Sequence, residues 1–108
     1  MPAKYIPRRG DIIWTDIDQA TGQVSQPAMV LSQEPFNQQI QLALVAPIAN
    51  CVRGHGFEVV LEGGEIQGAV LCQQVRTIDY ESRGVKFAEK APDEITLDVL
   101  AKVRVLVS

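Results

Sequence analysis

The chain has one histidine, His55, and Arg53 stands two residues before it. Histidine has an ordinary pKa near neutrality, so it can take up and release a proton at physiological pH. An arginine guanidinium stays charged and can hold phosphate oxygens with a planar set of donors. The two residues could therefore supply the proton carrier and the anion-binding group for a reaction at a phosphate. The alternative is that both are solvated loop residues, since the sequence reveals no partner that would orient His55.

Other cationic side chains could extend this pair into a basic surface for nucleic acid. They are Arg8, Arg9, Arg76, Arg83 and Lys86. Such a surface would contact phosphates and leave the reading of sequence to unstacked bases. Each of these residues could instead be ordinary surface charge, and Arg76 could pair with Asp79. Because the net charge is -3, from 13 acidic and 10 basic residues, a nucleic-acid site would have to be local.

Cysteine usage and hydropathy argue against several other classes of function. Cys51 and Cys72 do not form a CxxC pair, and with a single histidine they argue against a zinc site. Cys72 lies in an apolar run, which predicts a small core residue. The chain has no run of 18 apolar residues, and its first ten residues lack the apolar stretch of a secretion signal. We therefore expect a cytoplasmic protein that uses no cofactor and no metal and does not enter a membrane.

Five blocks of sequence read as the short strands that would have to position these side chains. They are RGDIIW at 9–14, QPAMVLS at 26–32, LVAPI at 44–48, GFEVVL at 56–61 and QQVRTID at 73–79. Residues 50–56 break the apolar pattern with two glycines, which predicts a hairpin with a long loop. Residues 35–37 could form a short turn or a helical loop. Trp14 could stack on a base, but its place in an alternating apolar strand favours packing in the core.

Residues 93–107 have the period of a helix. Ile95, Val99, Val103 and Leu106 recur every three or four residues, so they would line one helical face, packed on the core or on a partner chain. Several strands followed by one helix predict a single domain over residues 1–108, mainly β with helices (α+β). A small, strongly bent antiparallel sheet or barrel would be covered by an amphipathic C-terminal helix. A domain of this size buries only about two thirds of its unfolded surface, so dimerisation could add to its stability.

The five blocks, in this order, resemble the MazF/PemK family of toxin endoribonucleases from type II toxin-antitoxin systems, which includes Kid and ChpB. The resemblance extends over nearly the whole chain. It implies a small SH3-like or CcdB-like antiparallel β-barrel that pairs as a homodimer. It also implies a metal-independent mRNA interferase that cleaves single-stranded RNA at short sequences and is restrained by a cognate antitoxin with an acidic, disordered tail.

The chain differs from the family at two catalytic positions. The family has an arginine before the proline of the second block and a threonine after the third, where this chain has Gln26 and Ala49. Gln26 can donate neutral hydrogen bonds but carries no charge, and the Ala49 side chain donates nothing. The family's Asp-Gln pair reads Gln73-Gln74 here, so Gln73 is a further candidate for the RNA groove. Loss of one preorganised donor typically costs roughly 100- to 1000-fold in rate.

These differences leave alternatives open. The chain could be a working ribonuclease in which Arg53 and His55 replace the missing groups. It could instead be a catalytically silent relative that dimerises and binds antitoxin or RNA without cleavage. A topoisomerase poison like the CcdB relatives is disfavoured, because that mechanism depends on a tryptophan near the chain end and this chain ends in VLVS.

Overall fold

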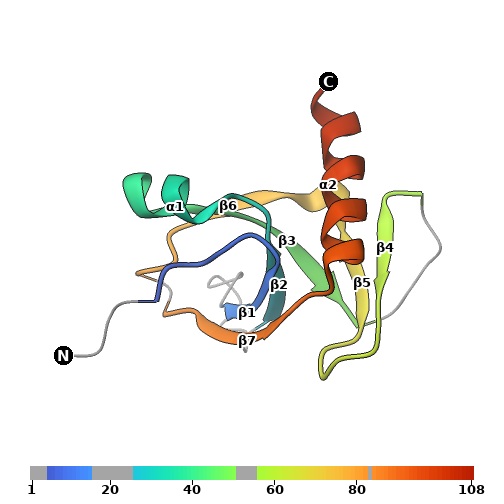
Figure 1. Cartoon of the computed structure of the whole chain (residues 1–108), viewed down its shortest axis with the longest axis horizontal. Coiled ribbons are helices and arrows are strands. Elements are labelled where there is room, and N and C mark those ends of the chain that lie inside the picture. The colour runs from blue at the N-terminus through green and yellow to red at the C-terminus, as the bar shows by residue number, and fades with distance from the viewer. Residues whose placement is uncertain (1–4, 16–25, 51–55, 83) are drawn as a thin grey trace.

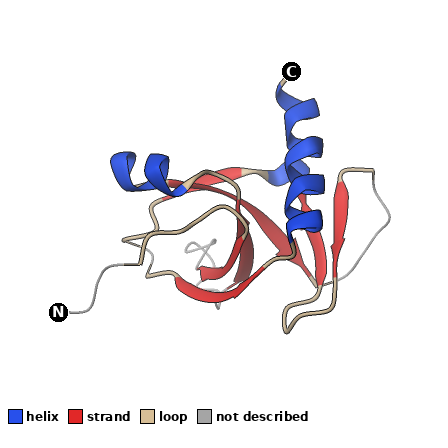
Figure 2. Ribbon diagram, in the orientation of Figure 1, coloured by secondary structure: helices blue, strands red, loops and turns tan. Residues whose placement is uncertain are grey.

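Short strands account for most of the regular structure in the described residues, and two α-helices and a 3-10 helix accompany them. The computed structural model describes residues 5–15, 26–50, 56–82 and 84–108. The elements in chain order are β1 (Asp11–Thr15), β2 (Gln26–Val30), α1 (Glu34–Ile40), β3 (Ala43–Ala49), β4 (Glu58–Leu61), β5 (Gly68–Leu71), the 3-10 helix η2 (Cys72–Gln74), β6 (Arg76–Ile78), β7 (Lys86–Lys90) and α2 (Asp93–Val107). Figure 2 shows the strands gathered into one bent sheet with the helices at its margin.

β3 is the centre of the sheet because it pairs with strands on both of its sides. All pairings are antiparallel, and the order is β4-β5-β3-β2-β1-β7, with β6 also paired to β3. On one side β3 pairs with β2 through residues 45–47. On the other side it pairs first with β6 and then, from Ile48, with β5. Pro47 has no N–H to donate, which suits the point at which β3 changes partner.

Alternation of side chains sends neighbouring residues of β1 and β2 into two separate cores. Ile12 and Met29 belong to the larger core, which also contains Ala46, Ile48, Val70 and Val99. Ile13 and Ala28 belong to the smaller core on the other face, with Val30, Val45, Ile78 and Tyr80. Full burial of a large aliphatic side chain contributes about 1.5–3 kcal/mol, so these two cores hold the sheet in its bent form.

α2 covers the larger core and lies alongside β4 (Figure 1), with η2 also packed against it. Val99 is fully buried, and Ile95 and Val103 are partly buried against the same core. Leu106, the fourth residue of the predicted stripe, is 42% exposed near the end of the helix. The predicted mainly β fold with an amphipathic C-terminal helix is therefore confirmed.

Two expectations about the strands are wrong. Residues 50–56 do not join a hairpin, because β3 and β4 are not paired and β5 lies between them. Within the block at 73–79, residues 76–78 form the strand β6 as expected, whereas Gln73 and Gln74 belong to the 3-10 helix η2. β7 has no counterpart among the predicted strands, since its sequence KFAEK is rich in charge and shows no apolar alternation.

Trp14 is not packed in the core as expected. Its side chain is 39% exposed, although its neighbours Ile13 and Thr15 are buried. Trp14 pairs with Pro27 on β2 and with Lys86 on β7, close to the end of β1. α2 packs mainly against β4 and η2, so it does not cover this part of the sheet.

Candidate functional site

Gln26 and Ala49 lie at the same end of the sheet. β1 and β2 are paired with Thr15 opposite Gln26. β2 and β3 are paired as far as Ala28 opposite Pro47, and Gln26 and Ala49 each lie two residues beyond that last pair, at the same end of the two strands. Residues opposite each other on antiparallel strands project from the same face, with Cβ atoms roughly 5 Å apart. These three residues, Thr15, Gln26 and Ala49, are called the Gln26 row.

The Gln26 row offers hydrogen-bonding groups but no charge. Gln26 and Ala49 are half-buried, so a ligand could reach the carboxamide of Gln26. The Thr15 side chain is 1% exposed, and its Oγ1 has no hydrogen-bond partner within the described parts of the chain. An amide can bind a phosphate oxygen by donating from its NH₂ group, but it cannot neutralise the added charge of a transition state.

Gly68 fixes the approach of β5 to this end of the sheet. A Cβ atom built at Gly68 would lie 1.9 Å from the carbonyl oxygen of Ala49. Its φ of +149° also belongs to the region that favours glycine. The close backbone approach therefore requires glycine here, and it holds the Ala49 end of β3 against β5.

Lys86 and Trp14 lie near the same end of the sheet but on its other face. Lys86 pairs with Trp14, one step from Thr15 along β1, and both side chains are exposed. Successive residues on a strand point to opposite faces, so Trp14 projects away from the face of the Gln26 row. An exposed aromatic ring beside a cation is an arrangement that single-stranded nucleic acid can use for base stacking and phosphate contact.

Gln73 and Arg76 lie further along β3. Arg76 pairs with Val45, and Gln73 belongs to η2, which connects the two strands that pair with this side of β3. Both side chains are exposed. They therefore sit near the middle of β3, several residues from Ala49 rather than beside it.

Arg8 and Arg9 are at the opposite end of the sheet from the Gln26 row. The N–H of Gly10 donates to the carbonyl of Val30 (2.8 Å), which is the far end of β2 from Gln26. Arg8 Nε lies 3.0 Å from Glu34 Oε2, and Arg9 Nε–H donates to the carbonyl oxygen of Leu31 (2.6 Å). The two arginines are thus separated from Gln26 by the length of β2, roughly 15 Å.

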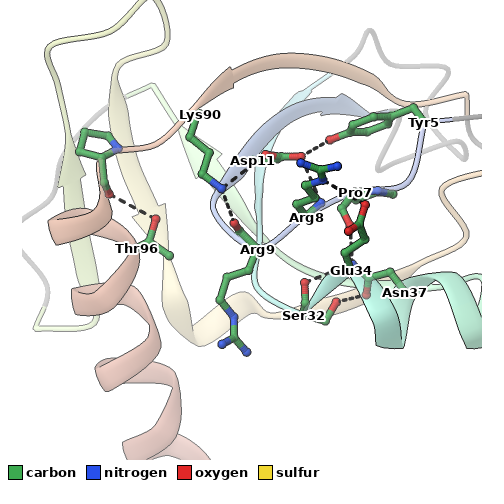
Figure 3. A network of polar contacts seen from close by, with 11 residues as sticks. Tyr5, Pro7, Arg8, Arg9, Asp11, Ser32, Glu34, Asn37, Lys90 and Thr96 are labelled. Atoms are coloured by element: carbon green, nitrogen blue, oxygen red, sulfur yellow. Dashed lines mark hydrogen bonds and ion pairs between the residues drawn. The ribbon is translucent and has the colours of Figure 1, made fainter.

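A polar network holds this opposite end together (Figure 3). The carboxylate of Asp11, which is buried, accepts hydrogen bonds from Tyr5 Oη (2.6 Å) and the N–H of Arg8 (3.1 Å). Lys90 Nζ lies 3.9 Å from Asp11 Oδ1 and donates to the carbonyl of Arg9 (2.8 Å). The pKa of the Tyr5 hydroxyl is raised mainly by its burial and, to a smaller extent, by the nearby Asp11 carboxylate. Arg8 therefore makes contacts that anchor residues 5–10, and a role in RNA binding would come in addition to them.

Three of the predicted site residues, Arg53, His55 and Arg83, lie outside the described residues, as does Cys51. Within the described ranges, no three His, Cys, Asp or Glu side chains are grouped so as to hold a metal ion. Cys72 is fully buried, as predicted, and burial raises the pKa of its thiol to about 11, so the thiol stays protonated at neutral pH. No helix in the described part of the chain has the length and hydropathy needed to cross a membrane.

A largely apolar groove of about 790 Å³ runs between α1 and α2. From α1 its lining includes Phe36 and Ile40, which are 50% and 42% exposed. From α2 it includes Leu100 and Val103, and Arg9 stands in the lining as well. This α1–α2 groove is not anticipated by the sequence, because its two walls are far apart along the chain.

Thr15 is likewise absent from the residues that the sequence singled out. One signal could have identified it. Pairing the first two strand blocks as antiparallel neighbours on either side of residues 16–25 sets Thr15 opposite Gln26. That its hydroxyl is buried without a partner could be learned only from the packed structure.

Comparisons with known proteins agree with this architecture. The endoribonuclease toxin MazF of Escherichia coli strain K12 is 38% identical to this chain over 111 residues, covering 99% of each protein. The endoribonuclease toxin ChpB of the same strain is 40% identical over 108 residues, covering 92% of each. The MazE-MazF (Form-II) crystal structure from Deinococcus radiodurans has a TM-score of 0.88 and 29% identity, covering 97% of this chain and 98% of that one.

The resemblance stated for the five sequence blocks is thereby confirmed. The model of the family described as PemK-like, MazF-like toxin of type II toxin-antitoxin system matches residues 8–107. With nearly the whole chain matched, this protein belongs to the PemK-like, MazF-like toxins of type II toxin-antitoxin systems.

Proposed function

We propose that this toxin is a metal-independent endoribonuclease that cleaves single-stranded RNA in the cytoplasm. The observation that carries the proposal is its near full-length similarity, at 38% identity, to an endoribonuclease toxin. The location of Gln26 and Ala49 at the same end of the adjacent strands β2 and β3 supports it, since a reacting phosphate at that end would lie near both positions.

The reaction would use the ribose 2'-hydroxyl as nucleophile. Its oxygen bonds to the adjacent phosphorus while the bond to the 5'-oxygen breaks, leaving a 2',3'-cyclic phosphate and a free 5'-hydroxyl. One group must take the proton of the 2'-hydroxyl, another must protonate the leaving oxygen, and donors must stabilise the extra charge on phosphorus. Gln26 would contribute a donor to the phosphate. His55 would carry the proton, and Arg53 would supply the charge that Gln26 and Ala49 lack.

The RNA strand would continue beyond the Gln26 row across exposed cationic and aromatic side chains. Lys86 and Trp14 lie near that end of the sheet but on its other face, so the RNA strand would pass around the end of the sheet to meet them, and Gln73 and Arg76 flank the middle of β3. Arg83 is a further candidate. Arg8 and Arg9 would meet only an RNA long enough to cross the sheet, because they lie at its other end. Phosphate contacts of this kind position the strand, while stacked bases carry the sequence preference.

A second copy of this chain and a cognate antitoxin are the proposed partners. The α1–α2 groove and the exposed apolar residues Leu106 and Val107 suit self-association into a homodimer. The MazE-MazF structure from Deinococcus radiodurans is a precedent for an antitoxin partner. An acidic, disordered antitoxin tail would cover the cationic RNA-binding surface and so block RNA.

A catalytically silent toxin relative is the second candidate. It would dimerise and bind antitoxin or RNA without cleaving. The neutral amide of Gln26 and the methyl group of Ala49 favour it, because neither can supply the charge or the hydroxyl that the family uses at these positions.

Expression of the chain without an antitoxin separates the two candidates. The measurements are growth arrest of the host and cleavage of a panel of single-stranded RNAs by the purified protein. The matched comparison is the double variant Gln26→Arg, Ala49→Thr, which restores both family side chains. Cleavage by the unaltered chain supports the nuclease. Cleavage by the double variant alone would establish the silent relative.

If the unaltered chain cleaves, His55→Ala and Arg53→Ala test the substitute groups. Each should lower the rate by roughly 100-fold or more, the usual effect of removing a general acid or base or a charge-stabilising donor. Full activity in both variants would exclude these two residues from the mechanism and leave the nuclease assignment itself intact.

A further inference from the structure

The hydroxyl of Thr15 is a polar group that folding leaves unsatisfied. The side chain is 1% exposed, and its Oγ1 has no hydrogen-bond partner among the residues described. Burial of a hydroxyl without a partner is unfavourable, and valine would fill the same space without that cost. Packing alone therefore gives no reason for threonine at this position, so the hydroxyl is free for a contact made in another state of the protein.

The strand register determines which group the hydroxyl can reach. Thr15 is directly opposite Gln26, and residues so paired project from the same face with Cβ atoms roughly 5 Å apart. Thr15 lies two residues after Ile13 and Gln26 lies two residues before Ala28, so both continue the face of the smaller core. The nearest side chain with hydrogen-bonding groups across the ladder is therefore the carboxamide of Gln26.

A glutamine at an anion site has an orientation problem that an arginine does not have. The two ends of its carboxamide are nearly equal in size, but the NH₂ end donates to a phosphate oxygen while the C=O end repels it. An arginine guanidinium offers donors on all its nitrogens. A neutral amide at this position thus needs a neighbouring donor that holds its carbonyl oxygen and so directs its NH₂ group outward.

We propose that Thr15 is a positioning residue for the RNA phosphate. In the RNA-bound protein its hydroxyl donates a hydrogen bond to the side-chain carbonyl of Gln26, and the amide NH₂ of Gln26 then donates to a phosphate oxygen. The inference rests on the proposed function, since it assigns a role in RNA binding. It goes beyond that function by coupling Gln26 to a second residue of this chain.

The test compares Thr15→Val, which removes the hydroxyl at nearly constant shape, with Thr15→Ser, which keeps it. The full chain is titrated with a mixed-sequence single-stranded RNA that is 2'-O-methylated and cannot be cleaved. Thr15→Val should weaken binding about fivefold, the effect of losing one neutral hydrogen bond. Thr15→Ser should bind as the unaltered chain does. Thermal unfolding should show Thr15→Val to be at least as stable as the unaltered protein.

The Gln26→Arg background provides the decisive control. A guanidinium needs no orienting partner, so Thr15→Val should have no effect on RNA binding in that background. Equal losses in both backgrounds would mean that Thr15 acts only through packing, and they would overturn the proposal. Unchanged binding of Thr15→Val in the native background would overturn it as well.

A second measurement separates failure of this inference from failure of the proposed function. If the unaltered chain binds no RNA, the proposed function fails. The coupling is then read from the NMR signals of the Gln26 side-chain amide during titration with inorganic phosphate. A response that is present in the unaltered chain and lost in Thr15→Val supports the orienting hydrogen bond. Identical responses in the two proteins refute it.

Discussion

Asn37, on α1, makes contacts at the opposite end of the sheet through both its side chain and its backbone carbonyl. It is fully buried, and its Nδ2 donates to the carbonyls of Pro7 (2.8 Å) and Ser32 (3.1 Å). Its Oδ1 accepts from the hydroxyl of Ser32. Its backbone carbonyl accepts from Tyr80 Oη (2.8 Å). One residue of α1 thus ties together the segment before β1, the turn after β2 and the segment after β6. Figure 3 shows Asn37 beside Ser32.

We predict that Asn37→Ala destabilises the protein by about 2–4 kcal/mol, because it leaves buried carbonyl groups without donors and opens a cavity. Urea unfolding, followed by circular dichroism, measures the loss. Gln38→Ala on the same helix is the control, since Gln38 is exposed. It should change stability by less than about 0.5 kcal/mol. Equal stability of the two variants would show that the Asn37 network contributes little.

The residues of the candidate site could be predicted from the sequence to different degrees. Gln26 and Ala49 could be identified because the motifs around them are local and the resemblance fixes their positions. The exposure of Trp14 could not be predicted, because the alternating pattern of a strand does not show which part of the sheet a helix will cover. The burial of the Thr15 hydroxyl depends on three-dimensional packing around the end of β1, which no local pattern encodes.

At the scale of the elements, the β4–β5 turn is fastened to β7 by one carboxylate. Glu89 accepts hydrogen bonds from the backbone N–H groups of Glu65 (3.2 Å) and Ile66 (2.8 Å). A Cβ atom at Gly64 would lie 2.6 Å from Glu89 Oε1, so glycine makes room for the carboxylate. β4 and β7 are the two ends of the strand order, and this contact brings the turn beside β4 against β7. The open sheet is thereby drawn toward a barrel.

We expect Glu89→Ala to lower the free energy of unfolding by about 1–3 kcal/mol, since two backbone donors lose a charged acceptor. Hydrogen exchange should show the amides of Glu65 and Ile66 exchanging faster. The amides of β2 and β3 should lose no more protection than the drop in global stability accounts for. Glu62→Ala removes an exposed carboxylate near the same turn and serves as the control. Unchanged exchange at residues 65 and 66 in Glu89→Ala would disprove the fastening role.

Elements whose signal is periodic could be predicted, and those defined by distant partners could not. α2 follows from its apolar spacing and from Pro92 before it. β7 is stabilised by pairing with β1 rather than by an apolar face of its own, so its charged sequence does not predict a strand. β3 and β4 look like a hairpin along the chain. The insertion of β5 between them is a property of the whole sheet.

For the whole molecule, charge is consistent with local rather than general attraction to RNA. The net charge is -3, and several cations of the described residues are already engaged with carboxylates: Arg8 with Glu34, Lys90 with Asp11 and Lys102 with Asp98. RNA binding would therefore depend on a few remaining cationic side chains, so the affinity should fall only shallowly with added salt, because the salt dependence scales with the number of phosphates neutralised. An acidic partner could bind the same small set of cationic side chains and cover them.

The α1–α2 groove gives the molecule an apolar surface that a monomer would leave in water. Phe36 on α1 lines the groove and is 50% exposed, so a charge can replace it without disturbing the core. We predict that Phe36→Glu shifts the proposed homodimer to monomer at micromolar concentration. Burying an unpaired carboxylate in an apolar interface would cost several kcal/mol, which exceeds what a modest interface can offset. Sedimentation equilibrium measures the mass directly.

Gln38→Glu adds the same charge to the same helix outside the groove, because Gln38 is exposed and is not among the groove residues. It should leave the dimer intact, and both variants should keep the circular dichroism spectrum of the unaltered chain. A dimer that survives Phe36→Glu would exclude the groove as its interface and would direct attention to the exposed end of α2 at Leu106 and Val107. Dissociation by both variants would instead indicate a general charge effect. Loss of the dimer in Phe36→Glu alone identifies the groove as the surface through which two toxin chains associate.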